Sequence, residues 1–298
     1  MSFLKGLGIS ILNFLLFLSL SLFGLALTLN NTILNPDFIV AELDKLDIHS
    51  LATEIISEQI PQELEFMTGV IDDTIADLEP WIREQMNDTV YSGYDYLKGR
   101  SQSLDLVVSI EPVKEKFKNN LWQAFLESLP PALSVLPPAA LEQRFNEFYD
   151  DFTSEIPSTF EFDENTLPPE VMTQLQQIRQ YIGYFQLGYK ALMAFILLLI
   201  LGIILISRQV RGSTRVIGTT FLTYGAFGYA GILIAKHFAT PYMAQIPLPE
   251  MPPALQAWMQ QLFNNLLVPL EMFSLGILIG GVALLIVSFA YKPRQPSY

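Results

Sequence analysis

The side chains best suited to chemistry in this sequence are carboxylates that stand close together. Asp72, Asp73 and Asp77 share one stretch of expected helix, and two carboxylates held together can divide the roles of general acid and general base. In a chain with 30 Asp and Glu residues, such neighbours also arise by chance. We therefore interpret them as a solvated acidic face rather than a catalytic pair.

A second acidic stretch resembles the start of a calcium-binding loop. Glu161, Asp163 and Asn165 alternate in the way that the first ligands of such a loop do. An EF-hand loop needs glycine at its sixth position and a bidentate glutamate at its twelfth, where this sequence has Thr166 and Met172. We reject an EF-hand here, and weak surface binding of calcium or magnesium stays an open alternative.

No other motif in the sequence predicts a catalytic residue, a metal ligand or a cofactor. His49 and His237 lack a second ligand at metal-binding spacing, and there is no cysteine, no G-x-S-x-G, no phosphate-binding loop and no dinucleotide fingerprint. The prediction is a protein that is not an enzyme. An enzyme acting on lipid or envelope material at the outer face remains an alternative, because active sites can be assembled from scattered residues.

Four apolar stretches are long enough to cross a bilayer, whose hydrocarbon core needs about 20 apolar residues of helix. Because 51% of the chain is hydrophobic and these residues are bunched, we predict a mainly α, four-pass transmembrane bundle. The first stretch is interpreted as an uncleaved anchor, with a signal peptide as the alternative. The predicted spans are Leu7–Leu29, Leu187–Ile206, Val216–Ala235 and Leu270–Ala290.

The basic residues outside the spans predict the orientation, since Lys and Arg in short loops stay in the cytoplasm. The charge between residues 30 and 184 is opposite, with 28 acidic and 9 basic residues, a net charge of −19. Both termini are therefore expected in the cytoplasm and residues 30–184 outside. The residues that carry this prediction are Lys5 at the N-terminus, Arg208, Arg211 and Arg215 in the turn after the second span, and Lys292 and Arg294 in the tail.

The charge and the cysteine content also limit which partners and which kind of organism are expected. A nucleic-acid-binding protein needs a basic face, whereas the large loop is strongly acidic, so no nucleic acid is expected. Disulfides are common in the extracellular domains of animals, and their absence favours the plasma membrane of a prokaryote.

The acidic region is predicted to be a helical domain with one β-ribbon. Asn35 followed by Pro36 marks a helix start, and two short helices or one bent helix follow. A helix through Leu64–Leu78 is expected to break at Pro80, and a further helix to end near Gly99. Alternating apolar residues predict a two-stranded ribbon between 104–110 and 158–163.

Two helices are expected in the sequence between the two strands of that ribbon, and another after the second strand. Residues 113–129 form the first, and residues 141–152 form the second, with a buried stripe of Leu141, Phe145, Phe148 and Phe152. A last helix opened by Pro169 keeps its phase into the second span, which predicts one continuous helix of about 57 Å at 1.5 Å per residue.

These patterns divide the chain into five regions. They are a transmembrane anchor (1–29), an acidic extracytoplasmic helical domain (30–184), the second and third spans with a basic turn at 207–215 (185–235), a second outer segment with a short amphipathic helix (236–269), and the fourth span with its basic tail (270–298).

Glycine is dense in the third and fourth spans, where small residues let helices approach closely in lipid. Gly225 and Gly228 in the third span and the GxxxG of Gly276 and Gly280 in the fourth are the predicted packing residues. Packing among the four spans and packing against a partner protein are both open.

The function predicted from these features is interaction, sensing or scaffolding at the cell envelope through the outer domain. Its partners would be the lipid bilayer and a protein bound by that domain or by the glycine-rich spans. An accessory subunit of a membrane transport or enzyme complex is the first alternative. Several aromatic residues could form a groove for a peptide, glycan or lipid, although such residues more often fill the core of a helical domain or lie on the lipid surface. They are Trp81, Tyr91, Tyr94, Tyr96, Trp122, Tyr149 and Trp258.

Overall fold

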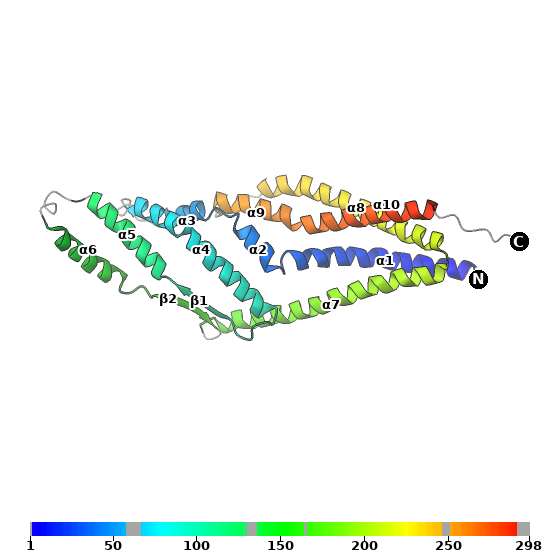
Figure 1. The fold of residues 1–298 in the computed structure, drawn as a ribbon, viewed down its shortest axis with the longest axis horizontal. Coiled ribbons are helices and arrows are strands. Elements are labelled where there is room, and N and C mark those ends of the chain that lie inside the picture. The colour runs from blue at the N-terminus through cyan, green and yellow to red at the C-terminus, as the bar shows by residue number, and fades with distance from the viewer. Residues whose placement is uncertain are drawn as a thin grey trace. The chain divides into compact units, whose positions relative to one another are not determined.

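The computed structural model describes residues 2–57, 67–127, 129, 136–163, 166–245 and 251–290. These residues form a mostly helical fold with one small sheet, which confirms the predicted mainly α class (Figure 1). In chain order the elements are α1 (Ser2–Asn31), α2 (Pro36–Leu43), α3 (Ile48–Ser57), α4 (Met67–Leu97), β1 (Asp105–Ser109), α5 (Glu111–Glu127), α6 (Pro138–Thr153), β2 (Thr159–Asp163), α7 (Pro169–Ser207), α8 (Val210–Gln245), α9 (Pro253–Leu266) and α10 (Val268–Ala290).

The chain divides into two compact units. The membrane unit comprises Met1–Ile39, Gln180–Pro249 and Met259–Tyr298, and the acidic unit comprises Val40–Arg179 and Glu250–Trp258. Helix α7 begins in the acidic unit and ends in the membrane unit as one uninterrupted helix, as its phase predicted.

Four helices of the described chain are long and apolar enough to cross a bilayer, and the protein is a multi-pass membrane protein on that basis. Each contains one of the predicted spans. They are Leu4–Asn31, Pro169–Ser207, Val210–Phe238 and Pro253–Ala290.

The third of these helices differs from the prediction at both ends. Helix α8 already begins at Val210, so the connection from α7 is shorter than the predicted turn at 207–215. It also continues to Gln245, ten residues beyond the expected end of the span at Ala235. The backbone therefore stays helical through the first ten residues of the predicted second outer segment.

An apolar core holds the membrane unit together. Leu16 and Leu20 of α1 are buried against α7 and α8, together with Ile196, Leu199, Ile203, Ile217 and Tyr224. Packing of this kind, rather than hydrophobicity alone, joins helices that are all apolar.

The acidic unit contains the predicted β-ribbon. Strands β1 and β2 pair antiparallel, with Leu106 opposite Phe162 and Val108 opposite Phe160. A two-stranded ribbon is marginal alone, and here it lies next to a cluster in which Tyr96, Leu104 and Met172 are buried.

The short helices at the start of the unit follow the expected pattern. Helix α2 starts at Pro36, and the Asn35 side chain accepts the backbone N–H of Asp37 at 3.2 Å. A separate helix, α3, follows. Helix α9, later in the chain, returns to this region, since the Trp258 indole donates to the Glu42 carbonyl at 2.7 Å.

The predicted break at Pro80 is wrong, because α4 continues through this proline as one helix of 31 residues. Proline removes the backbone bond to the carbonyl of Ala76. The helix is held on both sides of that gap: Ile75 and Leu78 are buried before it, and an ion pair between Glu79 and Arg83 spans it at 2.6 Å. The predicted end near Gly99 is confirmed, and Gly99 has a positive φ of 73° that favours glycine.

Candidate functional site

Helix α6 carries an apolar row that faces solvent. Leu141, Phe145 and Tyr149 are buried at intervals of four, whereas Phe148 and Phe152 are 60% and 51% exposed. The two exposed rings stack on each other with centroids 6.3 Å apart. The prediction that Phe148 and Phe152 belong to the buried stripe is therefore wrong.

The reason is that α6 has two apolar rows and only one of them can be buried. The buried row packs on Phe117, Leu121 and Phe125 of α5. Tyr149 is fixed there by donating its hydroxyl proton to the Lys114 carbonyl at 2.6 Å. Once this row faces α5, each member of the other row lies about 100° around the helix from the adjacent member of the buried row. Phe152 still reaches the edge of α5, since its ring centroid lies 6.3 Å from that of Phe117, and about half of its side chain stays exposed.

The exposed row extends past the end of the helix. Ile156 follows Phe152 by four residues and is 40% exposed. Two contacts fix its position: its N–H bonds to the Thr153 carbonyl at 3.0 Å, and its own carbonyl accepts the Lys114 ammonium at 2.7 Å. We call Phe148, Phe152 and Ile156 the apolar row of α6.

An acidic row runs beside it. Glu147, Asp151 and Glu155 each precede one member of the apolar row by a single position, and all three are exposed. Residues at this spacing lie along one side of a helix. The apolar row is therefore bordered by the buried row on one side and by carboxylates on the other.

Burial and charge act together on the tyrosine of the buried row. Desolvation, followed by the nearby carboxylates of Glu111 and Asp150, raises the pKa of Tyr149. A phenol is already a hydrogen-bond donor at neutral pH, and the raised pKa extends this protonated form to higher pH.

An apolar pocket of about 400 Å³ lies elsewhere in the acidic unit. It is bordered mainly by one side of α4, where Trp81, Met86 and Val90 contribute, and is completed by Leu43 of α2 and Val108 of β1. No ionisable side chain lines it. The pocket has the chemistry of an apolar contact and not that of acid–base catalysis.

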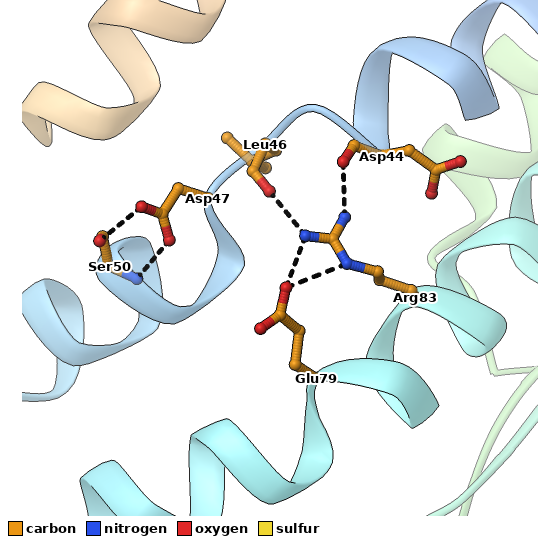
Figure 2. A network of polar contacts seen from close by, with 6 residues as sticks. All are labelled: Asp44, Leu46, Asp47, Ser50, Glu79 and Arg83. Atoms are coloured by element: carbon orange, nitrogen blue, oxygen red, sulfur yellow. Dashed lines mark hydrogen bonds and ion pairs between the residues drawn. The ribbon is translucent and has the colours of Figure 1, made fainter.

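Arg83 fastens the turn between α2 and α3 to α4, beside this pocket. Figure 2 shows its guanidinium donating to the Glu79 carboxylate and to the backbone carbonyls of Asp44, at 2.8 Å, and Leu46, at 3.2 Å. Such a fork of donors meets several acceptors at once, which a lysine cannot do. The turn that positions Leu43 is thereby fixed.

Asp47 in the same view is the N-cap of α3. Its carboxylate accepts the backbone N–H and the hydroxyl of Ser50 at 2.9 and 2.7 Å (Figure 2). The backbone hydrogen bond from Ser50, and then the hydroxyl bond, lower the pKa of Asp47.

The carboxylates that suggested chemistry make structural contacts. Asp72 accepts the Thr53 hydroxyl at 3.1 Å and lies 3.2 Å from the His49 ring nitrogen, while Asp77 pairs with Lys116 at 3.7 Å. Asp163 caps its own turn through the Thr166 N–H at 2.7 Å. Within the described ranges, no three His, Cys, Asp or Glu side chains are grouped to hold a metal ion.

The aromatic residues proposed from sequence are not gathered on one surface. Tyr96 and Tyr149 are buried, Trp122 packs against Phe145 with ring centroids 4.8 Å apart, and Trp81 lines the pocket. Of the seven predicted aromatic residues, only Tyr91 is an exposed large hydrophobic residue in the described part of the chain.

The glycines of the third and fourth spans differ in their surroundings. A Cβ on Gly225 would lie 2.5 Å from the backbone nitrogen of Leu278, and one on Gly228 would lie 2.8 Å from the Ser274 hydroxyl. A Cβ on Gly280 would meet the Phe221 ring at 3.8 Å, and one on Gly276 would meet nothing within 4 Å. Gly281, which adjoins this GxxxG, lies against the backbone of Leu222.

The basic residues of the predicted topology have varied positions. Arg208 lies in the connection between α7 and α8 with a φ of 54°, and Arg211 and Arg215 lie near the start of α8. Lys292 and Arg294 fall outside the described residues. Lys5 donates to the carbonyl of Ser207 at 3.0 Å, at the end of α7.

An ion pair in the membrane unit was not predicted. Lys236 of α8 pairs with Glu271 of α10, and both side chains are about three-quarters buried, at 25% and 23% exposure. The sequence contained a signal for it, because the two residues border consecutive spans on the same predicted side. Opposite charges at one depth of a membrane tend to pair.

Comparison of the chain with protein-family profiles, with curated proteins and with solved structures finds no match.

Proposed function

We propose that this protein is a non-enzymatic multi-pass membrane protein whose acidic unit binds a partner at the cell envelope. The apolar row of α6 carries the proposal. A helix that packs one apolar row on its neighbour and presents a second to solvent has the arrangement expected of a binding surface, since soluble domains rarely leave large apolar groups side by side in water.

The proposed orientation has both termini in the cytoplasm and the acidic unit outside. It is supported by Arg208, which lies between the second and third candidate spans, and by Arg211 and Arg215, which lie near the start of the third. The lack of cysteine supports a prokaryotic plasma membrane. A reporter fused after Tyr298 that is active only outside the cell would contradict this orientation.

Isolation of the protein from its native membranes in mild detergent tests the binding role. We expect a partner in stoichiometric amount, and its loss from a Phe148→Ala/Phe152→Ala variant that keeps the wild-type elution volume. The identity of that partner decides between a scaffolding protein and an accessory subunit of a larger complex. A protein that is isolated alone and monomeric at native abundance would contradict the proposal.

A further inference from the structure

We infer that α6 binds a basic amphipathic helix of a partner protein, with apolar side chains against the apolar row and lysines or arginines against the acidic row. This inference rests on the proposed function, because it names the chemistry of the partner for the same surface.

The apolar row is suited to contact a helix. Phe148 and Phe152 are spaced by four residues within α6, and rows at this spacing form the ridges that fit into the grooves of another helix. Ile156 adds an exposed apolar side chain just after the end of the helix. The stacked rings of Phe148 and Phe152 form a rigid apolar surface of two large side chains. Because Tyr149 and Phe145 hold α6 on α5, this surface is fixed before any partner arrives.

The negative charge of this surface favours a basic partner over a second copy of the chain or an anionic lipid surface. Between Pro138 and Asp163 the chain has seven carboxylates and one base, Arg144. A second copy of this chain would bring two such acidic rows together, and like charges across an interface cost free energy. An anionic lipid surface would be repelled for the same reason, whereas a basic segment is attracted.

The position of the charges also matters. Glu147 and Asp151 lie along the side of the apolar row that faces away from the buried row, and Glu155 is exposed in the turn just after the helix. A partner helix on Phe148 and Phe152 would therefore meet carboxylates along one of its edges. Its basic residues are expected at intervals of three or four along that edge, next to its own apolar stripe.

A designed peptide provides the probe. We would use an 18-residue helix with leucines on one face and lysines on its flanks, and measure its binding by fluorescence anisotropy. The full-length protein would be held in phosphatidylcholine nanodiscs, with empty discs measured in parallel because such peptides also bind lipid. The expected result is saturable binding above that of empty discs, which weakens as salt rises.

Two double variants separate the apolar and the acidic contributions. Phe148→Ala/Phe152→Ala should weaken binding about tenfold or more, as loss of central aromatic anchors does. Glu147→Gln/Asp151→Asn should weaken it about fivefold and reduce its dependence on salt. The matched control is Glu84→Gln/Asp88→Asn on α4, which removes the same two charges from exposed positions elsewhere in the unit and should leave affinity within about twofold.

The inference is overturned if protein-containing discs bind no more peptide than empty discs, or if the control charge variant weakens binding as much as the α6 charge variant. It is also overturned if the aromatic variant binds as tightly as wild type. These results are distinct from failure of the proposed function. A native partner lost from the aromatic variant, with no binding of the basic peptide, would retain the binding role and remove the basic helix.

Discussion

Helices pack through small residues in the membrane unit and through large aromatic residues in the acidic unit. In the membrane unit, α8 and α10 meet where side chains are absent: Gly225 lies against the backbone of Leu278, and Gly281 against that of Leu222. In the acidic unit, α5 and α6 meet through large rings, including Trp122, Phe145 and Tyr149. Where backbones approach this closely, a larger side chain at the glycine cannot be accommodated. Aromatic packing buries only one side of a helix and leaves the other side exposed.

The difference has a consequence for function. Helices in lipid can present apolar side chains outward without cost, so exposed leucines in the membrane unit need no partner. The same exposure in the acidic unit leaves Phe148 and Phe152 in water. The apolar row of α6 is therefore a feature that a binding partner would explain.

The largest expected effect comes from filling the α8–α10 contact. Gly225→Leu places a side chain where the backbone of α10 lies 2.5 Å from the new Cβ, and we expect a loss of more than about 3 kcal/mol and little monodisperse protein. Gly276→Leu is the control, because its Cβ meets nothing within 4 Å. Size-exclusion profiles of both variants check this, and equal profiles would contradict the packing contrast.

Breaking the ion pair between α8 and α10 should have the next largest effect. Glu271→Gln leaves Lys236 about three-quarters buried without its partner, and we expect a destabilisation of about 1–2 kcal/mol after allowance for solvent screening. Thermal melts in detergent measure it. The double exchange Lys236→Glu/Glu271→Lys should recover part of the loss, and a double variant as unstable as the sum of the two single changes would show that the charges do not interact.

In the acidic unit, Arg83→Ala should cost about 2 kcal/mol, since three acceptors lose a charged donor. Arg83→Lys should recover only part of this, because an ammonium cannot reach all three in the same geometry. Hydrogen exchange at α2 and α3 is the measurement. Unchanged protection in Arg83→Ala would mean that the turn is held by other contacts.

The smallest effect is the pH dependence of the α3 cap. The pKa of Asp47 is lowered in the folded state, so its contribution is complete above the ordinary value of about 3.9 and is lost as pH falls through the lower folded pKa. Hydrogen exchange of the first turn of α3, corrected for intrinsic rates, should increase below about pH 4. Asp47→Asn keeps a capping oxygen without a charge, and its exchange should not show this pH step.

Much of the fold could be predicted because its patterns are local. The four apolar helices follow from length and composition, and the pairing of β1 with β2 follows from alternation in two short segments. The structure confirms the pairing, and it adds the register, with Leu106 opposite Phe162, which was not predicted.

The features that could not be predicted depend on which neighbour a helix meets. The sequence of α6 has apolar residues at 141, 145 and 149 and again at 148, 152 and 156, and only the position of α5 decides which row is buried. Likewise, Pro80 ends a helix by its own chemistry, yet contacts on both sides keep α4 whole. For Lys236, the sequence places Glu271 at the border of the next span on the same predicted side, but the ion pair itself depends on the packing of α8 against α10.

Site-specific photocrosslinking in native membranes tests the central claim most directly. A photoreactive amino acid would replace Phe148 in the apolar row and, as the control, Ile55, an exposed residue of α3. The account predicts one discrete crosslinked protein from position 148 and little or none from position 55. Absence of a crosslink at 148, or the same products from both positions, would contradict a binding surface on α6.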